Sequence, residues 1–191
     1  MTDIERIIGE NISVKHSVLD NHDLLQRIDM FAKKLVETFR RNNKVLFCGN
    51  GGSAADAQHI AAELSGRFYL DRKPLYAEAL HCNSSYMTSV SNDYGFENVF
   101  SRAVEEMAKT GDVLVGISTS GNSGNILNAF DMARKMGIFT IAMTGKDGGK
   151  IAPLSDLLIN VPSDCTPRIQ ETHIMIGHIV CELVEKELFG K

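Results

Sequence analysis

A histidine and a glutamate four residues apart are the first residues in this sequence whose types and spacing can do chemistry. His59 and Glu63 fall in an alanine-rich stretch with a helical pattern, and residues i and i+4 of a helix share one face. An imidazole beside a carboxylate can act as an acid/base pair or supply two ligands to a metal ion. The same spacing is common in ordinary helix-surface pairs, so it does not decide between these interpretations.

A glycine-rich loop precedes this pair. Residues 44–48 are apolar, which predicts a short buried strand, and residues 54–64 have the pattern of a helix, with Ser53 as its expected N-cap. Glycines between a strand and a helix let backbone N–H groups approach an anion, and the helix dipole adds partial positive charge. We therefore expect a phosphate site close to His59 and Glu63. The same dipole is sufficient to explain Asp56 in the expected first turn.

A serine-rich loop strengthens the case for a phosphorylated ligand. Residues 112–117 form the clearest strand pattern of the chain and lead directly into hydroxyl side chains, and in open α/β sheets ligands bind outside the carboxyl ends of the strands. Uncharged donors suit a phosphate monoester that is held rather than transferred. One such loop is also explained as a capped turn, but two on a single sheet favour a ligand. The hydroxyls belong to Ser118, Thr119, Ser120 and Ser123.

Two nucleotide-binding patterns are not satisfied. Residues 49–54 fit the dinucleotide fingerprint, but residues 80–83, at the end of the next expected strand, contain no carboxylate to hold a ribose. Residues 145–150 contain glycines and lysines without the spacing of a P-loop. We expect a solvated turn there, with a place in the lining of the ligand site as the less favoured alternative. We therefore expect a phosphorylated small molecule and no nucleotide cofactor.

The elements that must position these loops alternate between strand and helix. Further strands are expected at 75–80, 138–143 and 156–161. Further helices are expected at 84–91, at 96–109, from the end of the serine-rich loop to residue 136, and at 169–188, with a turn at 92–95. This order predicts an α/β three-layer sandwich, a parallel sheet of about five strands with helices on both faces. Two apolar-striped helices in residues 1–41 precede it, and we expect their stripes to pack. The chain is expected to form one domain, 1–191, with a helical extension, 1–41, and an α/β core, 42–191.

Composition excludes several classes of partner. The chain has 191 residues, 43% of them hydrophobic, enough for an ample core. A net charge of −4 argues against a nucleic-acid surface. No apolar run approaches the roughly 20 residues of a membrane span, and the N-terminus does not have the pattern of a signal peptide. Four cysteines without CxxC spacing are typical of reduced thiols. We expect a cytoplasmic protein without a membrane or nucleic-acid partner.

The loops at 48–54 and 117–123 resemble those of the sugar isomerase (SIS) domain, whose members bind phosphosugars. The resemblance extends to residues 59–67, 91–96, 144–150 and 168–173, and so spans nearly the whole chain. One departure is Pro167, which stands just before Arg168 where family members carry an acidic residue. That departure puts an auxiliary polar contact of the family in doubt.

The resemblance implies an aldose–ketose isomerase that converts sedoheptulose 7-phosphate into D-glycero-D-manno-heptose 7-phosphate through an enediol. This would be the first step towards nucleotide-activated heptose for bacterial surface polysaccharide, in lipopolysaccharide or capsule. It further implies a homotetramer whose active sites are completed across subunits. The chemistry needs a base over carbon and a donor that moves protons between two oxygens, and a carboxylate and an imidazole suit both tasks.

The resemblance also implies a role for individual residues. Glu63 and His178 would be the acid/base pair. The phosphate would be held by Ser118, Thr119, Ser120 and Ser123, and the sugar would be contacted by Asn50, Gly51, Gly52, Ser53, Glu63, Asn92, Asp93 and Gln170. One zinc ion per subunit would be bound by His59, Glu63, Gln170 and His178. The metal and acid/base roles of Glu63 and His178 compete, since a residue bound to zinc is a poorer base.

Two alternative functions remain open at the level of the sequence. One is a non-catalytic SIS protein, either a phosphosugar sensor or a protein-binding scaffold. The other is an isomerase for a different phosphosugar, such as an arabinose 5-phosphate or hexulose phosphate enzyme. A pure binding module has no need for a positioned carboxylate and imidazole, so the presence of Glu63 and His178 favours an enzyme.

Overall fold

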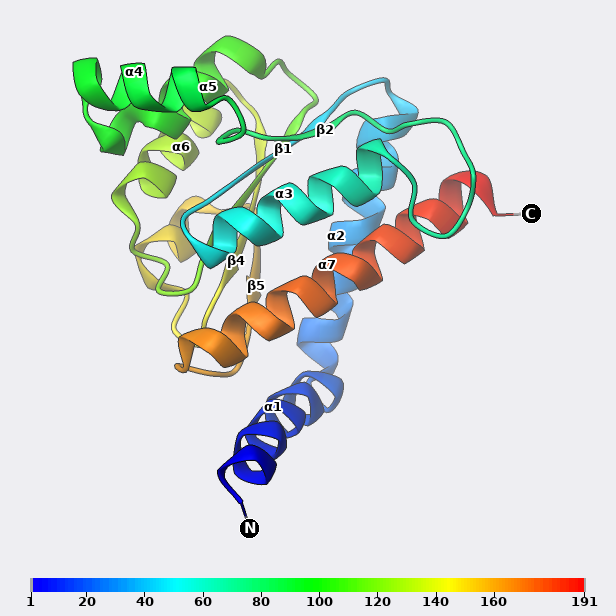
Figure 1. Ribbon diagram of the computed structural model, residues 1–191. Coiled ribbons are helices and arrows are strands. Elements are labelled where there is room, and N and C mark those ends of the chain that lie inside the picture. Colours follow the sequence, from blue (N-terminus) through cyan, green and yellow to red (C-terminus); the bar gives the residue numbers. More distant parts are fainter. Residues whose placement is uncertain (1, 191) are drawn as a thin grey trace.

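The computed structural model describes residues 2–190, and these residues form a parallel five-stranded sheet with the strand order β2-β1-β3-β4-β5 (Figure 1). The strands are β1 (Val45–Gly49), β2 (Ala77–Ala79), β3 (Val113–Ser118), β4 (Phe139–Thr144) and β5 (Leu157–Asn160). Strand β2 lies on one side of β1, and β3 lies on the other side. Strands β1 and β3 are paired along the whole of β1, with Val45 opposite Val113 and Gly49 opposite Ile117. The glycine-rich loop after β1 and the serine-rich loop after β3 therefore leave the sheet side by side.

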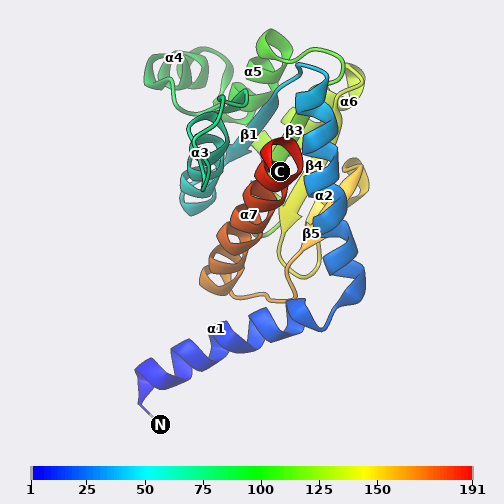
Figure 2. The same cartoon turned by 90° about the vertical axis from the view of Figure 1, so that its right-hand side faces the viewer.

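Helices cover both faces of this sheet, as the alternation of patterns predicts (Figures 1 and 2). One layer consists of α2 (His22–Arg40), α3 (Gly52–Ser65) and α7 (Thr166–Phe189), and the other of α4 (Ser84–Tyr94), η1 (Phe96–Asn98), α5 (Val99–Met107), α6 (Gly124–Lys135) and η2 (Gly149–Leu154). Successive residues of a strand point to opposite faces, so Val45 and Phe47 join the first core and Leu46 and Cys48 the second. The predicted three-layer α/β sandwich is confirmed.

The N-terminal helix α1 (Asp3–Leu19) projects away from this body (Figure 2). Its expected packing is wrong within a single chain, because Ile4, Ile7, Ile8 and Ile12 are 70%, 41%, 54% and 49% exposed. The stripe of α2 does pack, and that helix begins after an N-cap at Asn21. None of the helices in residues 2–190 is both long and apolar enough to cross a membrane.

Several expected boundaries differ from the structure. The α3 helix begins at Gly52 with Gly51 at the N-cap position, so Ser53 lies inside the helix and is not its cap. The expected turn at 92–95 is wrong for residues 92–94, which continue α4. The expected strand at 75–80 is shorter, and part of the expected turn at 145–150 is the start of η2. In each case tertiary packing outweighs local turn and strand propensities.

Candidate active site

Three side chains that can transfer protons or bind a metal ion meet on the surface formed by α3 and α7. The Nε2 atom of His59 lies 3.1 Å from Oε1 of Glu63 and 3.4 Å from Nε2 of His178. One ligand atom from each of the three residues falls within 4.8 Å of the others. His59 is exposed, and the other two side chains are partly buried. The structure thus brings His178, distant in sequence, to the pair predicted from its i, i+4 spacing.

Two glycines let α3 and α7 approach each other closely, one beside this cluster and one at the glycine-rich loop. A Cβ atom on Gly177, the residue before His178, would lie 2.5 Å from Cδ1 of Ile60, the residue after His59. A Cβ atom on Gly52, at the start of α3, would lie 2.5 Å from Nε2 of Gln170. Gln170 therefore lies at the glycine-rich loop, about 12 Å along α7 from His178. Gly177 was not predicted, because it has no local signal in the sequence pattern of α7.

The glycine-rich loop is tied to the start of α6 by a pair of amide side chains. Asn50 and Asn125 donate to each other through reciprocal hydrogen bonds of 2.9 Å. Gly51 has φ +55° and ψ −122°, a conformation that is essentially restricted to glycine. Ser53 is 4% exposed, and its N–H donates to the Asn50 carbonyl at 3.0 Å. Asn125 was not predicted, because its pairing with Asn50 joins residues 75 positions apart and has no local signal in the sequence.

The serine-rich loop has the geometry of an anion site. The hydroxyls of Ser118 and Ser123 lie 3.0 Å apart, and Ser123 occupies the N-cap position of α6 without capping that helix through its side chain. The N–H of Asn122 donates to the Ser120 hydroxyl at 3.2 Å. The loop thus presents hydroxyls at a helix N-terminus, where partial positive charge favours an anion.

A hollow of about 260 Å³ continues from this loop towards the first turn of α7. Thr119 and Ser120 line it on one side, and Lys146 and Asp147 on another. The N–H of Gly145 donates to the Thr119 carbonyl at 2.9 Å, which joins the 145–150 segment to the serine-rich loop. The 145–150 segment therefore borders the candidate phosphate site, which was the less favoured of its two expected roles.

Asn92 and Asp93 are predicted site residues that lie on α4, away from the α3–α7 surface. Both are exposed near the end of α4, and the Asn92 amide donates to the Asp93 carboxylate at 2.8 Å. The α4 helix packs mainly against α5 and η1. A single chain therefore does not bring these two residues beside His59, Glu63 and His178 (Figure 1).

Two ionisable groups, Asp56 and His173, have pKa values that burial shifts away from their usual range. Burial raises the pKa of Asp56 to about 6, while the charge of the nearby His59 lowers it. The Oδ2 atom of Asp56 has no hydrogen-bond partner among the described residues. Asp56 was expected to be stabilised by the dipole in the first turn of α3, and this is wrong because it lies beyond that turn and is partly buried. Burial lowers the pKa of His173 to about 4, with the hydrogen bond to the Thr144 carbonyl at 3.0 Å opposing the shift.

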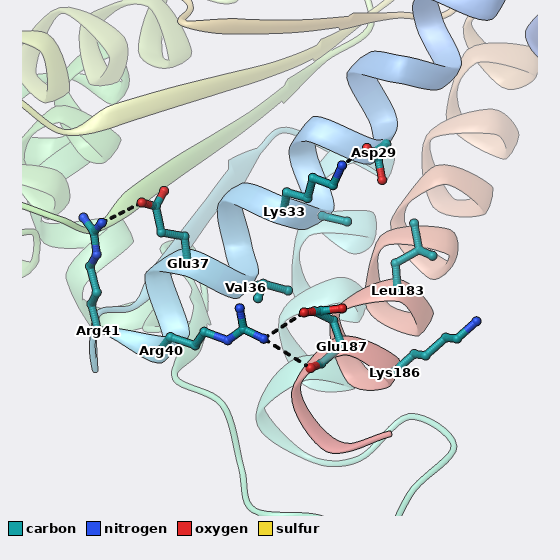
Figure 3. A pocket seen from close by; sticks show the side chains of 10 residues that line it. Asp29, Lys33, Val36, Glu37, Arg40, Arg41, Leu183, Lys186 and Glu187 are labelled. Carbon is teal, nitrogen blue, oxygen red and sulfur yellow. Dashed lines mark hydrogen bonds and ion pairs between the residues drawn. The ribbon is translucent and has the colours of Figure 1, made fainter. Parts of the chain in front are cut away.

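A larger hollow, of about 670 Å³, lies away from these residues, between α2 and the end of α7 (Figure 3). Its floor is apolar, with Val36 and Leu183, and its rim is charged. Most of the rim charges are paired with each other, as in the Arg40–Glu187 contact of 2.8 Å. None of the predicted site residues lines this hollow, so its size does not make it the candidate active site.

The parallel sheet, the glycine-rich loop and the serine-rich loop correspond to a known family. Residues 13–145 match the model of the SIS domain. The chain belongs to the SIS domain family.

Within this family, the chain has high sequence identity to one group of enzymes over nearly its whole length. A phosphoheptose isomerase of Sulfurimonas denitrificans is 50% identical over 187 residues, which cover 98% of this chain and 96% of that protein. A phosphoheptose isomerase of Clostridium acetobutylicum is 52% identical over 188 residues, with the same coverage. The structure of phosphoheptose isomerase from Neisseria gonorrhoeae superposes with a TM-score of 0.90 at 42% identity, covering 97% of this chain and all of that one. Within the SIS family, the chain is thus similar over nearly its whole length to phosphoheptose isomerases.

Proposed function

We propose that this protein is an aldose–ketose isomerase that converts sedoheptulose 7-phosphate into D-glycero-D-manno-heptose 7-phosphate. The observation that carries the proposal is the cluster of His59, Glu63 and His178, with its ligand atoms within 4.8 Å, on an SIS fold. The high identity to phosphoheptose isomerases over nearly the whole chain supports this substrate. An SIS protein that only binds phosphosugars would not need these three groups together.

Glu63 and His178 divide the proton transfers of the reaction. One removes the proton from the carbon next to the carbonyl, and the other moves protons between the O1 and O2 oxygens of the enediol. A carboxylate and an imidazole within 4.8 Å of each other can address neighbouring carbon and oxygen atoms of one sugar. The reaction requires no redox cofactor, because one carbon of the sugar is oxidised while its neighbour is reduced.

The rest of the substrate is held by the two loops. The Ser118–Ser123 hydroxyl pair, with Thr119, Ser120 and the N-terminus of α6, binds the phosphate. The sugar is contacted by Asn50, Gly51, Gly52, Ser53, Asn92, Asp93 and Gln170. The position of Gln170 against Gly52 supports a contact with the sugar at the glycine-rich loop. The hydroxyls hold the phosphate without transferring it, so they need no charged clamp.

The cluster also fits one zinc ion per subunit. Ligand atoms of a tetrahedral zinc site, with bonds of 2.0–2.1 Å, lie about 3.3 Å apart. The observed separations of 3.1 Å and 3.4 Å match that spacing, and two imidazoles with a carboxylate are a suitable donor set. His59, Glu63 and His178 would hold the ion. Gln170, expected as a further ligand, lies against Gly52 about 12 Å along α7 from His178 and so does not complete this cluster. When bound, zinc supplies positive charge that polarises the sugar oxygens.

We further infer a cytoplasmic homotetramer that supplies heptose for surface polysaccharide, in lipopolysaccharide or capsule. The exposed isoleucines of α1 support assembly, since a stripe of four such side chains on one helix is typical of an interface. The separation of Asn92 and Asp93 from the cluster supports sites completed across subunits. Light scattering on the purified protein tests the assembly directly, and a monomeric mass would contradict it.

The proposed reaction is tested by incubating the protein with sedoheptulose 7-phosphate and following the sugar by NMR, with and without a chelator. New signals of an aldose heptose 7-phosphate are expected, and their loss under chelation would support a metal in the site. If the ketose binds but stays unchanged with added zinc, the protein is a phosphosugar sensor or scaffold. Turnover of an arabinose or hexulose phosphate in preference to the heptulose would assign a different isomerase.

A further inference from the structure

A buried ion pair joins the end of α3 to α7 beyond the catalytic cluster. The side chains of Arg72 and Glu185 are 2% and 3% exposed, and Nε of Arg72 lies 3.0 Å from Oε1 of Glu185. Neither residue was singled out from the sequence, and neither belongs to the proposed substrate, zinc or acid/base groups.

Arg72 binds the carboxyl end of α3. Its guanidinium donates to the carbonyl of Glu63 at 2.9 Å and to that of Leu64 at 2.8 Å, and further to the carbonyls of Gly66 and Lys73 at 3.1 Å. The last carbonyls of a helix have no partner within the helix. Arg72 supplies a partner for the Glu63 carbonyl and shares the Leu64 carbonyl with the N–H of Leu75. One of these groups belongs to the backbone of Glu63 itself.

Glu185 binds the segment that follows α3. Its carboxylate accepts from three successive backbone N–H groups, those of Phe68, Tyr69 and Leu70, at 3.3, 2.7 and 3.0 Å. Burial alone would raise the pKa of Glu185, but these bonds and the one from Arg72 outweigh it and leave the pKa lowered, so the group is ionised at neutral pH. The ring of Phe68 lies 5.7 Å from the ring of His178, which stands two turns before Glu185 on α7.

We propose that the Arg72–Glu185 ion pair is a positioning device for the active site. It holds the end of α3 and the Phe68–Leu70 segment against α7, and this contact keeps Glu63 and Phe68 in place relative to His178. The inference rests on the proposed isomerase function only for its kinetic readout. Lysine cannot replace Arg72 in this role, because an ammonium group lacks the planar fork that reaches Glu185 and the α3 carbonyls together.

A second buried ion pair provides a matched control. Asp112 accepts from the Lys44 ammonium at 2.6 Å and from the backbone N–H groups of Lys44 and Lys109 at 3.0 and 2.8 Å. Its side chain is fully buried, like that of Glu185, but it precedes β3, and its hydrogen-bond partners Asn43, Lys44 and Lys109 belong neither to α3 nor to α7. Breaking this pair disturbs stability without reaching α3 or α7.

The test compares Arg72→Lys with Asp112→Asn, using wild-type turnover of sedoheptulose 7-phosphate as the reference. We expect Arg72→Lys to lower kcat by about ten- to a hundredfold, because an error of about 1 Å in the placement of a reacting group has such effects. KM should stay within about twofold, since the serine-rich loop is untouched. Asp112→Asn should change neither parameter. An unchanged kcat in folded Arg72→Lys, or an equal fall in Asp112→Asn, would overturn the proposal.

Amide hydrogen exchange in the unmodified protein provides a readout that needs neither a folded variant nor activity. The N–H groups of Tyr69 and Leu70 should exchange as slowly as those inside α3, although they lie outside any helix or strand. Exchange at the rate of an open loop would overturn the proposal even if Arg72→Lys and the milder Glu185→Gln fail to fold. A wild-type protein that does not isomerise the sugar but protects these amides would contradict the proposed function alone.

Discussion

Replacing Gly177 with alanine tests whether the close approach of α3 and α7 is needed for the site. The new Cβ atom would lie 2.5 Å from Cδ1 and 2.7 Å from Cγ1 of Ile60, whereas ordinary contacts begin at 3.4 Å. The helices must therefore separate by roughly 1 Å, or Ile60 must leave its rotamer. Ile60 is fully buried, so it has little room to move.

The expected changes follow from this overlap. Overpacking destabilises the fold by about 1–3 kcal/mol, whereas alanine in a helix interior is more stable than glycine by about 1 kcal/mol. The free energy of unfolding should thus fall by about 0–2 kcal/mol. The effect on turnover is larger, because His178 follows Gly177 directly while His59 and Glu63 stand on the opposing helix. A separation of 1 Å should lower kcat about a hundredfold.

Chemical denaturation and turnover of sedoheptulose 7-phosphate measure both quantities. Gly9→Ala is the matched control, since a Cβ atom there has no neighbour within 4 Å and the same gain in helix propensity applies. In an Ile60→Ala background only the Ile60 Cβ atom remains, 4.0 Å away, so Gly177→Ala should there be stabilising. Wild-type turnover in Gly177→Ala, with a gain in stability like that of Gly9→Ala, would refute the reasoning.

Three further predictions concern single groups. Glu63→Gln should abolish turnover and retain phosphosugar binding, measured by calorimetry; full activity would exclude Glu63 as an acid/base residue. Zinc should raise the melting temperature of the wild-type protein but not of His59→Ala, and an equal rise in both would place the ion elsewhere. The pKa of His173 is lowered from 6.5 to about 4, so between pH 6.5 and 4 this histidine is protonated in the unfolded chain and neutral in the folded chain. Stability should therefore decrease as pH falls from 6.5 to 4, by about 3 kcal/mol in total, and urea denaturation of His173→Gln should lack that slope.

Local patterns were sufficient to predict most of the fold. The apolar run before Gly49 and the one before Ser118 are strands because both faces of a parallel sheet are covered, so every residue in them is buried. The alternation of strands and helices then restricts the sheet to a parallel arrangement. The errors occurred where neighbours in space decide, as for residues 92–94, which have turn propensity but continue α4.

The sequence by itself determined which chemical groups are present and that each of two loops follows a strand, because helical spacing and strand–glycine–helix order are local properties. It placed His59 beside Glu63 for the same reason. Only the tertiary structure decided that His178 joins them, since this depends on Gly177 meeting Ile60 across two helices more than a hundred residues apart. It also decided that Arg72 and Glu185 are buried partners. Such contacts are set by packing between elements, and no periodicity within either element encodes them.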